Sequence, residues 1–295
     1  MRIPCGSIHI GLDSPDGDLP FLSHAHSDHT SGLKRQARML SSPETLELAD
    51  IPAELATVEN AKLLDAGHIL GARQLAIEED GGRILYTGDF SVKPNVFGLK
   101  AEIPQCDRLI MDATYGDPSY VLPPLEETYS QIASWLRDND SRNLVIGSYE
   151  LGKAQEVVRI LNENGIAPIV TVKTDRFCSV YEKYGIALDR IMVGSDEAEE
   201  ALSRRFVAIV PMAKAKRYFA QRLEEAFGRD TLCAVATGWA MHYRFNADAA
   251  FPLSDHCDFS DLVSFVEQTG AKEVEAFCGD ASRVLARAKG AILNS

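Results

Sequence analysis

A short stretch of the chain, His24 to His29, concentrates side chains that bind metal ions. It holds three of the seven histidines, and its order, His-x-His-x-Asp-His, sets a carboxylate beside the last imidazole. Neutral imidazole and carboxylate are the usual ligands of zinc and related divalent ions. Neighbouring residues cannot face the same way on a regular element, so this string suits a tight loop with ligands around two centres. The alternative is a polar surface loop after a strand over residues 8–12, but the density of ligand residues favours a metal site.

Later segments carry a histidine or an aspartate where a strand-like run ends. His68 follows residues 63–65 in a glycine-flanked turn, Asp89 follows the apolar run 83–86, and Asp112 follows the apolar run 108–111. A carboxylate at a strand tip is well placed to bridge two cations. A satisfied turn histidine is the alternative for His68, and a turn-capping role is the alternative for Asp89.

These motifs together resemble one protein family. The pattern H-x-H-x-D-H after a strand resembles the signature of the metallo-beta-lactamase superfamily of binuclear metal hydrolases. Residues 112–116 (DATYG) resemble the [DE]-[AS]-T-[YF]-G element of its beta-CASP branch, whose members are nucleases acting on RNA and DNA. Residues 254–258 (SDHCD) resemble the branch's S-[AD]-H-x-D element. Within the branch, the chain looks most like 3′-end processing factor-like proteins and ligase-associated exonucleases.

The resemblance implies two divalent ions, zinc or alternatively manganese, held by seven ligands. The ligands would be His24, His26 and His68 for one ion, Asp28, His29 and His256 for the other, and Asp89 bridging both. Such a pair of ions activates a water for attack on phosphorus. His242, steadied by Asp112, would protonate the departing oxygen. A plain loop histidine is the alternative for His242.

Other polar residues have supporting roles in this interpretation. Asp13 ends the strand 8–12, where the superfamily often places an acid that positions a histidine ligand, although a turn-capping role is equally open. Asp255 or Asp258 would orient imidazoles from behind. Lys153 opens a helix after the strand 143–148, and a helix N-terminus can hold an anion. Lys153 could therefore contact a substrate phosphate, although a lone Gly-Lys pair is a weak signal.

The elements around these residues predict an α/β protein. Residues 119–235 alternate strand-like and helix-like runs, with strands at 143–148, 169–172, 190–193 and 205–211, which indicates a small α/β subdomain. By resemblance, residues 1–118 and 236–295 form an αββα metallo-beta-lactamase catalytic domain, and residues 119–235 form an inserted beta-CASP-like cap. The chain is expected to carry no appended RNA-binding domain.

The composition is that of an ordinary globular protein, with 45% hydrophobic and 25% charged residues. No apolar run approaches the roughly 20 residues that span a bilayer, so no membrane partner is expected. The N-terminus lacks a secretory signal, and six scattered cysteines without a C-x-x-C pair predict free thiols in the cytoplasm. A homodimer is left open.

The net charge of −13 argues at first against a nucleic-acid partner. The acid is unevenly distributed, however. Residues 119–235 carry 15 Lys+Arg against 17 Asp+Glu, whereas the remainder carries 15 against 26. Bound metal would neutralise part of that remainder.

The sequence therefore predicts a two-metal phosphodiesterase that cleaves single-stranded RNA or DNA. An exonuclease in RNA processing or DNA repair is favoured over an endonuclease, because the cap is short. The alternative is a metallo-hydrolase of a small-molecule ester, thioester or cyclic nucleotide, which the acidic charge favours. A non-catalytic nucleic-acid-binding scaffold is a third class, and the complete ligand set argues against it.

Overall fold

The computed structural model describes residues 1–292, which form two compact units. Unit 1 comprises residues 1–121 and the described residues from 255 onward, and unit 2 comprises residues 122–254. Unit 1 contains the strands that precede His24, His68 and Asp89. No helix among the described residues is long and apolar enough to cross a membrane.

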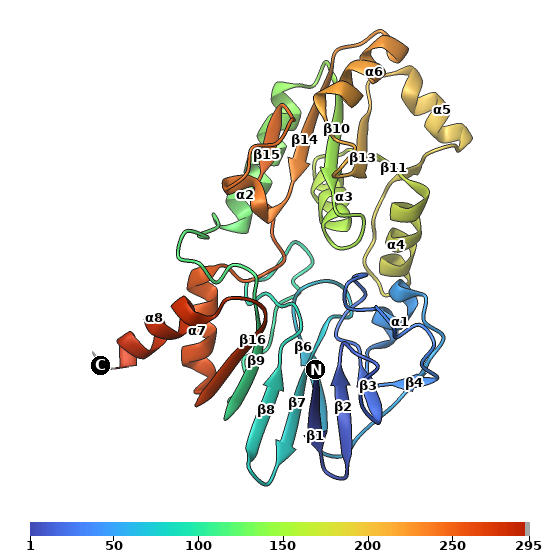
Figure 1. The fold of residues 1–295 in the computed structure, drawn as a ribbon. Helices are drawn as coiled ribbons and strands as arrows, with labels where there is room; N and C mark the ends of the chain where they lie inside the picture. The colour runs from blue at the N-terminus through green and yellow to red at the C-terminus, as the bar shows by residue number, and fades with distance from the viewer. Residues whose placement is uncertain (293–295) are drawn as a thin grey trace. The chain divides into compact units, whose positions relative to one another are not determined.

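Unit 1 is built on two sheets that share one hydrophobic core (Figure 1). The five strands of the larger sheet, in spatial order, are β16 (Glu273–Gly279), β9 (Arg108–Ala113), β8 (Gly82–Tyr86), β7 (Arg73–Glu79) and β6 (Ala61–Asp65). The smaller sheet contains β1 (Arg2–Cys5), β2 (Ile8–Leu12) and β3 (Leu19–Phe21). Ile10 and Phe21 from the smaller sheet meet Leu75, Ile77 and Ile110 from the larger one, and all five are fully buried.

Helices lie outside these sheets. α1 (Pro43–Ala49) packs Leu46 with Leu22 and Met39, beside a two-stranded sheet of β4 (Arg38–Met39) and β5 (Glu54–Leu55). α7 (Phe259–Thr269) contacts α8 (Ser282–Ile292) and sets Phe265 4.5 Å from Phe90, ring centre to ring centre. Two sheets with helices on their outer faces are consistent with the predicted αββα sandwich. The Ser42 hydroxyl accepts from the Thr45 N–H and so caps the start of α1.

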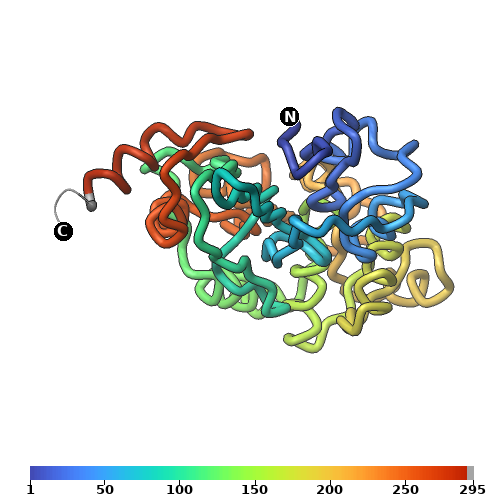
Figure 2. Tube along the Cα trace, turned by 90° about the horizontal axis from the view of Figure 1, so that it is seen from below, coloured from blue at the N-terminus to red at the C-terminus, as the bar shows by residue number. Residues whose placement is uncertain are grey.

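The strand directions in unit 1 gather several loops at one edge of the larger sheet. β6 and β7 are antiparallel, as are β7 and β8, whereas β8, β9 and β16 are parallel. The carboxyl ends of β6, β8, β9 and β16 therefore share one edge. The pairing of β9 with β16 also sets residues from opposite parts of the sequence side by side, as the green and red segments of the tube show (Figure 2). Loops from distant positions can consequently build one site.

Unit 2 is a six-stranded sheet in which all neighbouring strands are parallel. Its strands, in spatial order, are β12 (Ile191–Met192), β11 (Ile169–Val170), β13 (Val207–Pro211), β10 (Asn143–Ser148), β14 (Thr231–Ala236) and β15 (Ala249–Phe251). Its helices are α2 (Leu125–Asp138), α3 (Lys153–Glu163), α4 (Val172–Lys183), α5 (Asp196–Ser203), α6 (Arg217–Phe227) and the short 3-10 helix η1 (Gly238–Met241). The alternation of strands and helices agrees with the predicted α/β subdomain.

The segment 236–254 lies in unit 2, whereas the sequence analysis assigned it to the catalytic domain. The physical reason is β15, a three-residue strand that pairs with β14 through residues 249–251. So short a strand has no recognisable pattern in the sequence. The assignment of the two units to a catalytic domain and a cap stays a prediction.

Candidate metal centre

Four of the predicted ligands converge at the carboxyl edge of unit 1. His24, His26, His68 and Asp89 each offer one ligand atom, and these atoms lie within 4.8 Å of one another. The Nδ1 atom of His26 is 3.1 Å from His24 Nε2 and 3.0 Å from His68 Nε2. Three imidazole nitrogens and a carboxylate oxygen at this spacing can coordinate one divalent cation.

The carboxylate of Asp89 faces two sets of imidazoles. Its Oδ2 atom lies 3.5 Å from His24 Nε2 and 3.7 Å from His68 Nε2, whereas its Oδ1 atom lies 3.5 Å from His29 Nε2. The side chain of Asp28 is 78% exposed, and its Oδ2 atom lies 3.9 Å from the same His29 nitrogen. One carboxylate thus stands between the first imidazole group and the pair of residues predicted for a second ion.

His256 joins this site from the loop that precedes α7. Its Nδ1 donates to Asp112 Oδ2 over 2.8 Å, and its Nε2 lies 3.7 Å from Asp255 Oδ1. One ligand atom each from His256, Asp89 and Asp112 also falls within 4.8 Å of the others. The main-chain oxygen of Asp255 accepts from His68 Nδ1 over 2.8 Å, so the segment that carries His256 also orients His68. Asp258, by contrast, caps α7.

A second carboxylate, that of Asp13, organises the other side of the site. Its Oδ2 atom accepts from His29 Nδ1 at 2.7 Å, from the Ser23 hydroxyl at 2.7 Å and from the Tyr86 hydroxyl at 2.8 Å. The Ser23 oxygen lies 3.0 Å from His24 Nδ1, so it accepts from that ring while it donates to Asp13. His24 and His29 both turn Nε2 toward Asp89 as a result. The sequence flagged Asp13, but the roles of Ser23 and Tyr86 were missed because nothing in their spacing distinguishes them from ordinary strand-end residues.

Asp112 is held in the same manner. Thr114 donates to Asp112 Oδ1 through both its N–H, at 2.8 Å, and its hydroxyl, at 2.6 Å. The Asp112 N–H in turn donates to the Thr87 hydroxyl at 3.1 Å. With Oδ1 occupied by Thr114, Oδ2 is left for His256. In the sequence element D-x-T, the threonine thus binds one carboxylate oxygen of Asp112 and so orients the other oxygen toward His256.

Two glycines let the ligand loops approach their neighbours. Gly67 and Gly88 precede His68 and Asp89, and both have positive φ, +70° and +55°. A Cβ on Gly88 would lie 2.6 Å from the Ser23 Cβ, and one on Gly67 would lie 2.4 Å from a main-chain nitrogen and oxygen. Any larger residue would push the following ligand out of the site.

Burial and charge shift the pKa values at this site in ways that bear on metal uptake. Burial lowers the pKa of His29, but the hydrogen bond and charge of Asp13 outweigh it and raise that pKa to about 9. Burial also lowers the pKa of His256, but the charge and hydrogen bond of Asp112 outweigh it and raise that pKa to about 9. Metal ions must displace these protons, so binding releases protons and weakens as the pH falls.

The pKa of Asp89 is raised to about 7, first by its burial and then by the charge of Asp112, against the opposing imidazoles. Burial holds the pKa of His24 well below its usual value, and the neighbouring imidazoles add to the effect. A neutral His24 is the form that binds a cation.

Two predicted site residues, His242 and Lys153, lie in unit 2. His242 follows η1 and is exposed. Lys153 is the first residue of α3 and is buried, with its Nζ atom 5.2 Å from the centre of the Tyr149 ring. The roles predicted for both stay predictions.

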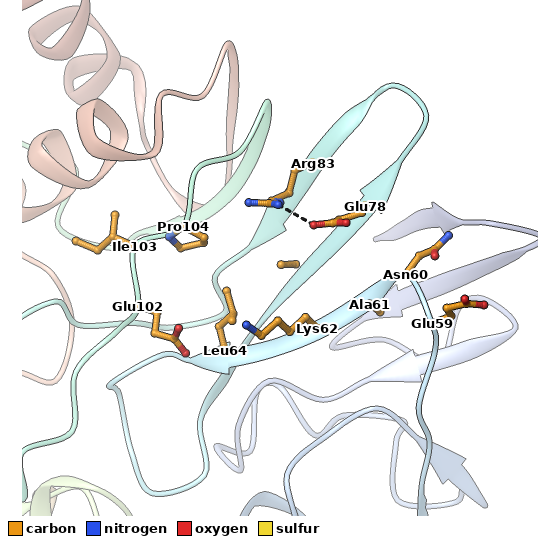
Figure 3. Close-up of a pocket in the computed structure, with 11 residues that line it drawn as sticks. Glu59, Asn60, Ala61, Lys62, Leu64, Glu78, Arg83, Glu102, Ile103 and Pro104 are labelled. Carbon is orange, nitrogen blue, oxygen red and sulfur yellow. Dashed lines mark hydrogen bonds and ion pairs between the residues drawn. The ribbon is translucent and has the colours of Figure 1, made fainter.

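A separate hollow of about 430 Å³ lies on the face of β6–β8 that is turned away from β1–β3 (Figure 3). Arg83 Nη2 is 2.7 Å from Glu78 Oε1, and Lys62 and Glu102 also line the hollow. None of its lining residues is a histidine or a cysteine, and it shares no residue with the metal cluster. It therefore lacks the imidazole donors that characterise the metal cluster.

Imidazoles and carboxylates that converge at the strand ends of an α/β sandwich define a metal-binding site of a hydrolase type. The chain is 33% identical over 284 residues to a probable DNA ligase of Opitutus terrae. The match covers 89% of this chain and 27% of that protein. It is 27% identical over 266 residues to the 5′ exonuclease Apollo of Gallus gallus, covering 84% of this chain and 55% of that protein. It is 28% identical over 170 residues to an RNase J-like protein of Methanocaldococcus jannaschii, covering 54% and 40%.

The chain thus spans between about a quarter and just over half of the length of these relatives. No protein-family model matches it. Together with the ligand motifs, the relatives identify the chain as a member of the beta-CASP branch of the metallo-beta-lactamase superfamily.

Proposed function

We propose that the protein is a two-metal phosphodiesterase that cleaves single-stranded nucleic acid from an end. The observation that carries the proposal is the carboxylate of Asp89. Its Oδ2 atom lies 3.5 Å from His24 Nε2 and its Oδ1 atom lies 3.5 Å from His29 Nε2. A carboxylate shared by two donor groups suits the paired ions that stabilise the attacking and leaving oxygens of a phosphodiester.

The proposed ligands are those of the sequence analysis. They are His24, His26 and His68 for one ion, Asp28, His29 and His256 for the other, and Asp89 for both. When bound, the two ions supply an activated water and neutralise charge on the phosphate. Zinc is proposed because imidazole nitrogen dominates the donor set, with manganese as the alternative.

The chain's own residues orient these donors and move a proton. Asp13 holds His29, and Asp112, fixed by Thr114, holds His256. These contacts favour His256 over His242 as the group that Asp112 positions. His242 remains the proposed proton donor to the leaving oxygen, and Lys153 the proposed contact to a substrate phosphate.

The proposal extends to architecture and substrate. Unit 1 is the catalytic domain and unit 2 the inserted cap. DNA is proposed ahead of RNA, in a repair process, because the relative named a probable DNA ligase matches 89% of this chain, whereas the RNase J-like protein matches 54%. Digestion from the 5′ end is proposed from the relative named a 5′ exonuclease. All six cysteines are free, which supports a reducing compartment such as the cytoplasm. The described residues do not support the homodimer, and we propose no oligomeric state.

The test is digestion of 5′-labelled and 3′-labelled strands of DNA and RNA by metal-loaded protein. The wild type and an Asp138→Asn control, which changes an exposed acid in α2, are expected to shorten DNA stepwise from the 5′ end. Asp89→Asn is expected to leave every strand intact. If the wild-type protein, with both metals bound, also left every strand intact, the nuclease proposal would be wrong. Turnover of a thioester or a lactone in the same samples would then favour a small-molecule hydrolase, and cuts within the strand would indicate an endonuclease.

A further inference from the structure

The segments that follow β13 and β14 in unit 2, which include the start of α6 and the short helix η1, form a surface of exposed cations and tyrosines. We propose that this surface, residues 211–223 and 237–247, binds single-stranded nucleic acid through phosphate contacts and base stacking. The inference rests on the proposed function, because it assigns the substrate of that activity a binding surface on unit 2, which contributes none of the proposed metal ligands. It concerns unit 2 alone.

The first loop is fixed by its packing over β10. A Cβ on Gly147 would lie 2.3 Å from the Cβ of Ala215, so only glycine in β10 lets this loop pass so closely. Ala215 is buried, whereas Lys214 and Lys216 on either side of it are exposed. The packing of Ala215 on β10 therefore holds Lys214 and Lys216 at the surface.

The second loop lies beside the first. The Arg217 N–H donates to the main-chain oxygen of Asn246 at 3.0 Å, and Arg217 Nε lies 3.1 Å from Asp248 Oδ1. Asp248 also accepts from the Cys233 N–H at 2.9 Å, which ties this pair to β14. The two loops therefore form one continuous surface rather than two separate patches.

The charge of this surface is opposite to that of the chain. Residues 211–223 and 237–247 contain five Lys+Arg and no Asp+Glu, in a chain with 43 acidic and 30 basic residues. Arg217 is paired with Asp248, and Arg222 is paired with Glu225. Lys214, Lys216 and Arg244 are exposed and make no ion pair with any described residue. Exposed cations without protein partners can bind phosphates of a nucleic acid and so release its counterions.

Aromatic side chains stand among these cations. Tyr218 is 67% exposed and Tyr243 is 58% exposed. The Tyr243 ring packs edgewise against Trp239, with 5.7 Å between ring centres. Rings held this way offer faces on which unpaired bases stack, and cations with interleaved aromatics characterise surfaces that bind single strands without sequence preference. A duplex has no free base faces to offer, so we expect single strands to bind more tightly.

The experiment measures the binding of dye-labelled oligothymidylate by fluorescence anisotropy, on an Asp89→Asn background that does not cut it. The triple variant Lys214→Ala/Lys216→Ala/Arg244→Ala is expected to bind roughly 100-fold more weakly at about 0.1 M salt, with a salt slope shallower by about 2. Tyr243→Ala is expected to lose about 5-fold with an unchanged salt slope, and Tyr243→Phe to retain stacking and bind as the parent does.

The matched control is Lys62→Ala/Arg287→Ala/Lys289→Ala, which removes the same charge from unit 1. An equal loss of affinity in this control, or an unchanged affinity in the surface variant, would overturn the inference. On a wild-type background the surface variant is expected to hydrolyse bis(4-nitrophenyl) phosphate normally, because its metal ligands are intact. If that ester is not hydrolysed even by the metal-loaded wild type, the proposed function fails, whereas the anisotropy result still decides the surface by itself.

Discussion

The metal cluster of unit 1 and the cationic surface of unit 2 hold their polar groups in opposite ways. In unit 1, His24, His68 and Asp112 are almost fully buried, and each is held by a named hydrogen bond. In unit 2, Lys214 and Lys216 are exposed and have no ion-pair partner among the described residues. A metal ion needs donors fixed in direction before it binds, whereas a polyanion is attracted by charge that needs no fixed direction. Conservative changes should therefore be severe in the first region and mild in the second.

The largest expected effect comes from Asp89→Asn. The amide keeps the shape of the side chain but removes the charge that faces both imidazole groups. We expect kcat on a small phosphodiester to fall by roughly 10³-fold, in line with the several kcal/mol that two-ion charge stabilisation supplies. Steady-state kinetics checks this, with Asp138→Asn as the control. Less than a tenfold loss would show that Asp89 does not link the two groups.

Asp112→Asn tests whether a carboxylate behind His256 tunes the site. Asp112 Oδ2 accepts from His256 Nδ1 at 2.8 Å, and its replacement weakens that donor. We expect metal affinity to fall by about 10–100-fold, the usual cost of losing such a partner. Competition with a chromogenic chelator measures it. If affinity stays unchanged while activity falls, Asp112 acts on the substrate or on His242 instead.

Ser23→Ala should have a smaller effect. It removes the link between His24 Nδ1 and Asp13 but leaves the bond between Asp13 and His29. We expect metal affinity to fall by about 3–10-fold, toward the lower end for an outer partner. The same chelator competition applies.

The control for that variant is Ser41→Ala, since the Ser41 hydroxyl is also buried and donates to the Leu22 carbonyl without contacting an imidazole. Its loss should lower stability by about 1 kcal/mol and leave metal affinity unchanged. Equal losses of metal affinity in both variants would contradict the role given to Ser23.

The smallest expected effect is a pH dependence of the metal-free protein. The pKa values of His29 and His256 are raised from 6.5 to about 9 in the fold, so their protonation stabilises it below pH 6.5 and that contribution is lost as the pH rises to about 9. The raised pKa of Asp89, about 7, acts in the same direction. The Tm of chelator-treated protein should fall by a few degrees between pH 6.5 and 9, roughly 2–6 °C. Metal-loaded protein should not show this fall, because the ions replace the protons. A Tm that rises over the same range would contradict the assignment.

The sequence identified the clustered imidazoles and carboxylates more readily than the groups that hold them. His24, His68 and Asp89 could be picked out because histidine is scarce and each stands beside a strand end or a glycine turn. Ser23 and Tyr86 could not, since serine and tyrosine are common at strand ends and their meeting at Asp13 depends on how two sheets pack.

The same division holds for the fold. Long strands such as β10 follow from local pattern, and the sequence predicted this strand with its observed bounds. The three-residue β15 exists only because β14 offers it a partner, so the limit of unit 2 at Ser254 depends on tertiary pairing that the sequence does not display.

The central claim is that unit 1 holds two metal ions around Asp89. The most direct measurement is anomalous diffraction from crystals of the metal-loaded protein. We predict two peaks, one among His24, His26 and His68 and the other beside His29 and His256. Each should lie about 2.0–2.2 Å from ring nitrogens. A single peak, or peaks away from these residues, would contradict the account.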